Sequence, residues 1–220
     1  MLCYRHAFKD TGDKRVRNMK RFGWVVLAAA AVSTASPVLA QSYVSDAEPF
    51  ISAVKSRDGD KATQLANDRP TVLNTRNAKG ETALNIVIAR SDELWTQFLL
   101  GKGADPNFAA SNGDTPLITA ARVGFLPAMD LLFQLGVKVD TANKMGETPL
   151  IVAVQQRELE AVKLLLAHGA DPDRKDSAAG YSARDYAKRD NRTRDILNAI
   201  EAAKKPASKP KSDDLNSFKL

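Results

Sequence analysis

The stretch Gly146-Glu-Thr-Pro-Leu-Ile-Val-Ala-Val154 opens the unit that organises this chain of 220 residues. Its first five residues recur at intervals of 33 residues, as Gly113-Asp-Thr-Pro-Leu117 and Gly80-Glu-Thr-Ala-Leu84. A second marker keeps the same period, as Gly103-Ala-Asp-Pro-Asn107, Gly136-Val-Lys-Val-Asp140 and Gly169-Ala-Asp-Pro-Asp173. Two independent markers that share one period indicate a repeated structural unit.

Each unit contains the signals of two short helices. Thr148 places a hydroxyl cap before Pro149 at the first helical position, where the missing N–H of proline costs nothing. Apolar residues then return at helical spacing in a second segment that includes Leu165, and Gly169 suits the left-handed residue that closes a helix. One helix pair cannot bury its own apolar face, so the pattern predicts that the units stack.

These motifs, together with the Ala-Ala and Leu-Leu pairs between them, resemble the ankyrin repeat over about residues 47–203. Three units are clear, at about residues 80–112, 113–145 and 146–179, and two degenerate units flank them, at residues 47–79 and 180–203. The resemblance implies an all-α solenoid of about five helix pairs with β-hairpin-like loops. Degenerate end units with a more polar outer face suit such a stack, because they keep it soluble.

The chain departs from the family pattern at two kinds of position. The histidine that usually follows Thr-Pro-Leu is replaced by Asn85, Ile118 and Ile151, so we expect its buried hydrogen bond to be lost. The glycine between the two helices survives only as Gly124, and the other units have Arg57, Ser91 and Arg157. We expect strain at those turns, and we expect Asn191 to take the left-handed position in the last unit.

Residues 1–40 have the pattern of a secretory signal peptide. Lys20 and Arg21 precede a short apolar run over residues 22–32, and Val38-Leu39-Ala40 supplies small residues at the cleavage site. We therefore expect cleavage after Ala40 and a periplasmic or secreted location, with no stable membrane span afterwards. An uncleaved N-terminal anchor is the alternative, and either Met1 or Met19 can be the true start.

The formal net charge of +6 belongs mainly to the leader. Seven of the 32 Lys and Arg residues but only two of the 26 acidic residues lie in residues 1–40, which leaves residues 41–220 close to neutral. We divide the chain into this leader, an ankyrin-repeat domain over residues 41–203, and a Lys- and Pro-rich tail over residues 204–220. The composition of the tail predicts disorder.

The residue types of residues 41–220 argue against catalysis, metal binding and a cofactor. The only cysteine, Cys3, lies in the leader, and His168 is the only histidine beyond it. His168 fits a helix end, the pair Asp171 and Asp173 fits a loop between units, and Asp58-Gly59-Asp60 fits a turn. No phosphate-binding loop or nucleophile elbow occurs. We therefore expect no enzyme activity.

Binding of another protein is the remaining hypothesis, because the resemblance implies that hairpin tips and inner helices line a concave face. Lys55, Arg90 and Arg122 form a possible basic row there, but nearby acids make the charge mixed, which argues against nucleic acid. Phe108 and Met145 are the expected apolar anchors. The residues expected on this face are Arg76, Lys79, Arg90, Phe108, Asn112, Arg122, Lys144, Met145, Gln155, Arg174 and Lys175.

We expect a monomeric, non-catalytic binding module that acts in the periplasm. Two alternatives stay open: an accessory or inhibitory subunit of an envelope enzyme, and binding to the envelope surface through the basic tail.

Overall fold

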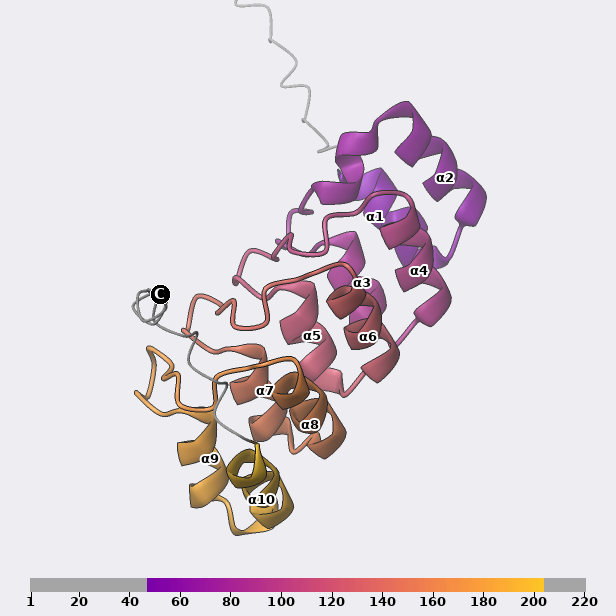
Figure 1. The fold of residues 1–220 in the computed structure, drawn as a ribbon. Helices are drawn as coiled ribbons and strands as arrows, with labels where there is room; N and C mark the ends of the chain where they lie inside the picture. Colours follow the sequence, from indigo (N-terminus) through magenta and orange to yellow (C-terminus); the bar gives the residue numbers. More distant parts are fainter. Residues whose placement is uncertain (1–46, 204–220) are drawn as a thin grey trace, which may run out of the picture. The chain divides into compact units, whose positions relative to one another are not determined.

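The computed structural model describes residues 47–203, which form ten α-helices in five consecutive pairs (Figure 1). The first, inner helices of the pairs are α1 (Ala47–Ser56), α3 (Ala83–Ala89), α5 (Pro116–Val123), α7 (Pro149–Gln156) and α9 (Ala183–Arg189). The second, outer helices are α2 (Gly59–Asp68), α4 (Glu93–Gly101), α6 (Leu126–Gln134), α8 (Leu159–Ala167) and α10 (Arg194–Ala202). Two 3₁₀ helices, η1 (Pro70–Asn74) and η2 (Asn191–Thr193), lie in the end units. The expected signal peptide and tail fall outside the described residues.

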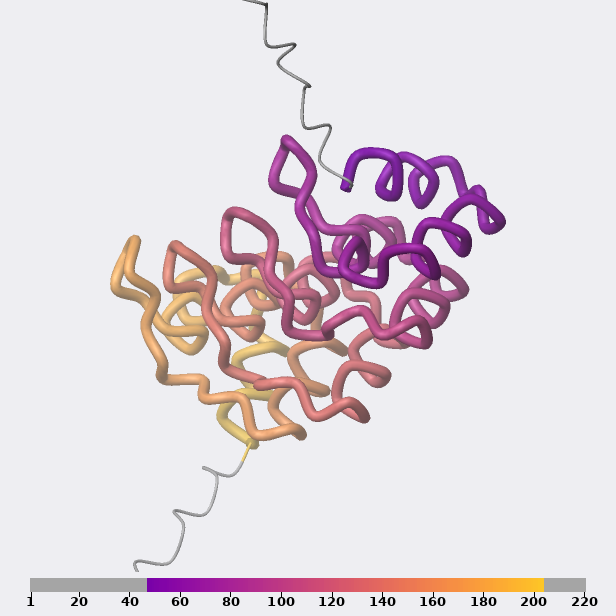
Figure 2. Tube along the Cα trace, turned by 90° about the horizontal axis from the view of Figure 1, so that it is seen from above, coloured from indigo at the N-terminus to yellow at the C-terminus, as the bar shows by residue number. Residues whose placement is uncertain are grey.

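The helix pairs stack in chain order, which confirms the predicted all-α solenoid. Each inner helix packs against the next inner helix, and α4, α6, α8 and α10 pack in a second row. The loops between pairs project on one side (Figure 2). Among residues 47–203 these loops form no strands, and two of them contain a single antiparallel bridge, Arg76 with Thr82 and Lys175 with Ser182.

The predicted caps begin the inner helices. The hydroxyl groups of Thr82, Thr115 and Thr148 accept hydrogen bonds from the backbone N–H three residues on, at 3.1, 3.2 and 3.3 Å. In the last unit Ser182 and Asp185 form a reciprocal capping box, in which each side chain accepts from the backbone N–H of the other residue. Each cap satisfies an N–H group that the helix itself leaves unpaired.

One column of apolar side chains shows how the outer helices build the core. Leu99, Leu132 and Leu165 lie 33 residues apart, and all three are fully buried. In the first unit Ala66 on α2 is also buried. The core is therefore continuous from unit to unit, as stacking requires. Among residues 47–203 none of the helices combines the length and the apolar character that crossing a bilayer demands.

The turns between paired helices adopt the left-handed conformation that the glycine position predicts. Gly124 has φ of 63°, and Arg57, Ser91 and Arg157 have φ of 59°, 53° and 63° without being glycine. The expectation for Asn191 was wrong. This residue begins η2, whose first turn is capped by the Asp190 carboxylate through the N–H of Arg192 at 2.9 Å. The last unit therefore replaces the left-handed turn with a short 3₁₀ helix.

We expect Ser91→Gly to stabilise the protein. A non-glycine residue in the left-handed region costs about 1–2 kcal/mol, and the extra chain entropy of glycine offsets about half of that. The free energy of unfolding in urea should therefore rise by about 0.5–1 kcal/mol. The reverse change, Gly124→Ser, is the matched control and should lower it, because a Cβ at that position meets the Glu158 side chain. A lower stability for Ser91→Gly would contradict the strain argument.

Candidate functional site

A row of acidic side chains follows the hairpin loops at a regular interval. Glu81, Asp114 and Glu147 lie 33 residues apart, each directly before the threonine that caps an inner helix. Asp114 and Glu147 are buried, and Glu81 is half-buried. We call these three acids, with Asn77 and Asn143, the polar ladder.

Asn143 holds the centre of the polar ladder. Its Oδ1 accepts hydrogen bonds from the backbone N–H groups of Met145 and Glu147, both at 3.0 Å. Its Nδ2 donates to Oδ1 of Asp114 at 2.9 Å and to Oε2 of Glu147 at 2.8 Å. The amide therefore shapes its own hairpin and links it to the preceding unit. Asn77 repeats the intra-loop bonds with Glu81.

The cations near the polar ladder are unevenly distributed. Lys55 lies 2.7 Å from Glu81, and this hydrogen bond is the main cause of the lowered pKa of Glu81. Arg122 lies 2.8 Å from Asp114. Among the described residues no Lys or Arg forms an ion pair with Glu147.

The predicted basic row of Lys55, Arg90 and Arg122 does not form. The position equivalent to Lys55 and Arg122, two residues before the left-handed turn, is occupied by Ala89 in the second unit. Arg90 lies one residue further on, and its guanidinium donates to the backbone carbonyls of Lys55 and Val54 at 3.0 and 3.2 Å. Arg90 thus closes the C-terminal end of α1.

The small side chains of Ala89 and Ala110 line a pocket of about 360 Å³ between the second and third units. Asn85 lies in its wall and is only 7% exposed. The Nδ2 of Asn85 donates to the carbonyl of Asp114 at 2.8 Å, whereas its buried Oδ1 has no hydrogen-bond partner among the described residues. Asn85 therefore makes a hydrogen bond between units at a position where we expected the histidine's buried bond to be lost.

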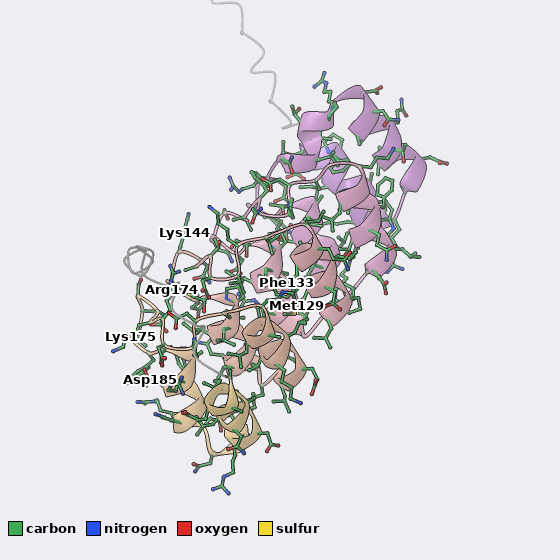
Figure 3. All side chains as sticks on the ribbon, viewed as in Figure 1. Met129, Phe133, Lys144, Arg174, Lys175 and Asp185 are labelled. Atoms are coloured by element: carbon green, nitrogen blue, oxygen red, sulfur yellow. The ribbon has the colours of Figure 1, made fainter. Side chains whose placement is uncertain are left out.

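Backbone hydrogen bonds fix the hairpin tips relative to one another. The N–H of Ser111 donates to Gly80, that of Lys144 to Asn112, and that of Ser177 to Met145, at 2.8, 3.1 and 2.9 Å. The tips therefore carry side chains on a rigid support. The predicted residues that lie exposed on or beside them are Arg76, Lys79, Asn112, Lys144, Met145, Arg174 and Lys175. Lys144, Arg174 and Lys175 lie together on the loop side of the stack (Figure 3).

The family model of ankyrin repeats (3 copies) matches residues 40–141 and 86–176. The chain belongs to the ankyrin-repeat family. Ankyrin repeats generally mediate protein–protein binding and are typically non-catalytic. No curated protein matches the chain.

The sequence suggested that Phe108 is an apolar anchor at a hairpin tip of the ankyrin stack. The structure places it elsewhere. It is half-buried, and the Arg76 guanidinium lies over its ring at 4.5 Å from the centroid. The Nε of Arg76 also donates to the carbonyl of Ala109 at 2.8 Å, so this pair joins two adjacent loops. Met145 is 52% exposed, and its role as an apolar anchor stays a prediction. Gln155 is half-buried on α7.

The other polar candidates take part in local structure. His168 caps the end of α8 and stacks on Phe133, with ring centroids 3.8 Å apart. Asp58 caps α2 through the N–H of Lys61 at 3.0 Å. Asp171 accepts the N–H of Asp173 at 2.9 Å, as in a loop turn. Within residues 47–203 no three His, Cys, Asp or Glu side chains group as a metal site would require.

The periodic acids of the polar ladder and the pocket at Ala89 were missed as features of a site. A signal for the acids was present, because each follows a repeated glycine and precedes a capping threonine. The pocket had no such signal, because it depends on two alanines that are distant in the sequence.

Proposed function

We propose that this ankyrin-repeat chain is a non-catalytic binding module that acts in the periplasm, or after secretion, on another protein. The binding surface is the inner face, which we define as the exposed side of the inner helices together with the hairpin tips. This surface corresponds to the concave face expected from the sequence.

The observation that supports this proposal is the contrast between a repeated support and variable tips. The polar ladder and the tip-to-tip backbone bonds recur from unit to unit. The tip pairs they hold differ: Ala78-Lys79, Ser111-Asn112, Lys144-Met145 and Ser177-Ala178. Surface residues held on a rigid scaffold bind at low entropic cost, and varying them changes the choice of partner without affecting the fold.

The pocket at Ala89 is where a partner side chain would insert. Its charged lining residues are Lys79, Glu81, Asp114 and Arg122, so their formal charges cancel. A neutral pocket of mixed polarity selects a partner side chain by hydrogen bonding and by shape. This lining does not form the continuous basic surface that nucleic acid requires.

We expect Ala89→Arg to abolish or strongly weaken partner binding. The new side chain occupies the position equivalent to Arg122 and fills the pocket. Gln155→Arg is the matched control, because it introduces the same side chain at the equivalent position two units later. Affinity should be measured by calorimetry on the partner retrieved by pull-down with the mature chain, with circular dichroism to verify folding. At least a tenfold loss for Ala89→Arg, about 1.4 kcal/mol, with little change for Gln155→Arg, is the expected pattern.

Replacing Lys144 and Met145 together by Ala tests the tips separately. An exposed anchor in an interface contributes about 2 kcal/mol or more when it is a hot spot, so a loss of tenfold or more is expected. Phe108→Ala is unsuitable for this purpose, because it also removes the contact with Arg76. If changes on the outer helices abolish binding and this double variant does not, the inner face is the wrong assignment.

The cellular location is tested by N-terminal sequencing of the exported protein, which should begin at Gln41. A protein that retains residues 22–40 in the membrane fraction would reject the cleaved form. Retrieval of one stoichiometric envelope enzyme in the pull-down would favour the accessory or inhibitory subunit. Salt-sensitive binding to envelope polymers that depends on residues 204–220 would favour the surface-binding alternative.

A further inference from the structure

The hairpin before α5 carries the only asparagine of the chain that is followed by glycine. Asn112 precedes Gly113, whereas other residue types precede the equivalent glycines of the neighbouring hairpins. Glycine is required there, because its φ is 86° and a Cβ would lie 2.7 Å from the backbone nitrogen of Lys144. The Asn112 side chain is exposed, so water reaches it. The turn therefore places a sterically open backbone nitrogen beside a solvent-accessible side-chain amide.

A substitution in the polar ladder activates this amide. In the preceding hairpin Oδ1 of Asn77 accepts the N–H of Glu81 at 2.9 Å. Ala110 stands at the equivalent position of the hairpin before α5, so the N–H of Asp114 is left for another acceptor. It donates to Oδ1 of Asn112 at 3.0 Å. A donor on this oxygen polarises the carbonyl and stabilises the negative charge that develops there when a nucleophile adds to Cγ.

The nearest nucleophile along the chain is the backbone nitrogen of Gly113. Its N–H donates to the carbonyl of Ala110 at 2.9 Å, and this bond closes the turn. Attack on Cγ of Asn112 therefore requires this bond to open. Opening one bond in an exposed turn costs far less free energy than unfolding the core. Meanwhile Nδ2 of Asn112 donates to Oδ2 of Asp114 at 2.8 Å, which keeps the amide oriented.

We propose that Asn112, activated by the N–H of Asp114, is a site of spontaneous deamidation that makes the pocket at Ala89 acidic. The nitrogen of Gly113 bonds to Cγ of Asn112, the Cγ–Nδ2 bond breaks, and ammonia leaves with the proton that Gly113 loses. Water then opens the cyclic imide. Cleavage at the side-chain carbonyl gives aspartate, and cleavage at the main-chain carbonyl gives isoaspartate.

Both products alter the inner face. Asn112 lines the pocket at Ala89, whose charged lining residues otherwise balance, so the new carboxylate gives the pocket a net negative charge. That carboxylate faces Asp114, which held the lost amide at 2.8 Å. Isoaspartate also reroutes the main chain through the side chain, which displaces the carbonyl that accepts the N–H of Lys144 at 3.1 Å. The effect on a partner rests on the proposed function, whereas the modification itself does not.

Mass spectrometry of the full chain during incubation at mildly alkaline pH tests the modification. The tryptic peptide of residues 103–122 should gain one mass unit at Asn112, with aspartate and isoaspartate separated by chromatography. Asn107 lies in the same peptide before Phe108 and should stay unchanged. A parallel sample in urea gives the rate for the unfolded chain. If only the urea sample is modified, the folded turn protects Asn112 and the proposal is wrong.

Two variants separate the effect of the turn geometry from that of the Asn-Gly pair itself. Ala110→Asn restores the ladder asparagine, which should accept the N–H of Asp114 and slow the modification of Asn112 at least about threefold. Lys79→Asn creates an Asn-Gly pair in the preceding hairpin, where the ladder asparagine is present. This new asparagine should be modified at least about threefold more slowly than Asn112. Equal rates at the two sites, or no effect of Ala110→Asn, would overturn the activation by Asp114.

Asn112→Asp reproduces the charge of the product and tests its effect on the pocket. The new carboxylate faces Asp114, so the melting temperature should fall at neutral pH. The difference from the wild type should narrow at lower pH, as a carboxyl is protonated. Asn112→Gln is the matched control, because it adds no charge and its longer side chain closes a ring far more slowly. An unchanged melting temperature for Asn112→Asp would overturn the charge effect. These readouts need no partner, so a failure of the proposed function, which Ala89→Arg tests, is seen separately.

Discussion

Leu165→Ala should lower the free energy of unfolding by about 2–5 kcal/mol, from lost transfer energy and the cavity left behind. Leu165 is 0% exposed and lies in the column that continues through Leu132 and Leu99. Its carbonyl also accepts the N–H of Ala170 at 3.0 Å, so the end of α8 is held close and cannot easily collapse into the space. Urea unfolding followed by circular dichroism measures the loss.

Leu135→Ala is the matched control for this prediction. Leu135 caps the end of α6 and is 53% exposed, so the same truncation removes little buried surface there. Its expected cost is within about 0.5 kcal/mol of zero, as for most surface substitutions. Comparable losses for the two leucines would show that the register of the outer helices is wrong. Because each unit contacts only its neighbours, Leu165→Ala should also broaden the transition if the last units unfold separately.

The repeat period was sufficient to predict the helices, their caps and the buried column, because these features depend on local sequence. The 33-residue spacing placed Thr82, Thr115 and Thr148 at helix starts, and all three side chains act as caps. Leu165 was predicted to be buried, and this is confirmed.

The inner face was harder to predict, because it depends on exact register and on contacts between units. The left-handed turns at Arg57 and Ser91 are 34 residues apart, whereas later turns are 33 apart. Arg90 also lies one residue before its turn, whereas Lys55 and Arg122 lie two residues before theirs, so Arg90 falls outside the row that they would share. Sequence position alone cannot show this, since the direction of a helical side chain changes by about 100° with each residue.

The hydrogen-bond partners of the asparagine side chains could not be predicted from the sequence either. Asn85 takes over a bond between units only because the backbone carbonyl of Asp114 approaches to 2.8 Å. Asn143 directly precedes the tip residues Lys144 and Met145, yet it is 8% exposed and belongs to the polar ladder. The periodic signal for this role was interrupted, because Ala110 stands where the neighbouring units have Asn77 and Asn143.

Asn143→Ala should therefore be among the most destabilising polar substitutions in the chain. It removes four hydrogen bonds and leaves buried oxygens of Asp114 and Glu147 without their amide donor. An unsatisfied buried polar group costs about 1–3 kcal/mol, and such terms are not additive, so a loss of about 2–4 kcal/mol is expected. Thermal and urea unfolding at neutral pH measure it.

Asn112→Ala separates burial from hydrogen bonding. Asn112 binds the same acid, with its Nδ2 donating to Oδ2 of Asp114 at 2.8 Å and its Oδ1 accepting the N–H of Asp114 at 3.0 Å. Its own side chain is exposed, so water can replace these bonds and the expected cost is about 1 kcal/mol or less.

Asn143→Asp makes the complementary change, because it keeps the acceptors but adds a third carboxylate beside Asp114 and Glu147. That variant should be destabilised at pH 7 and should recover part of its deficit relative to the wild type as the pH falls towards 4, because protonation relieves the repulsion. A cost for Asn112→Ala equal to that of Asn143→Ala would mean that the polar ladder is not a buried support for the tips, and the rigidity argued for the inner face would fail with it.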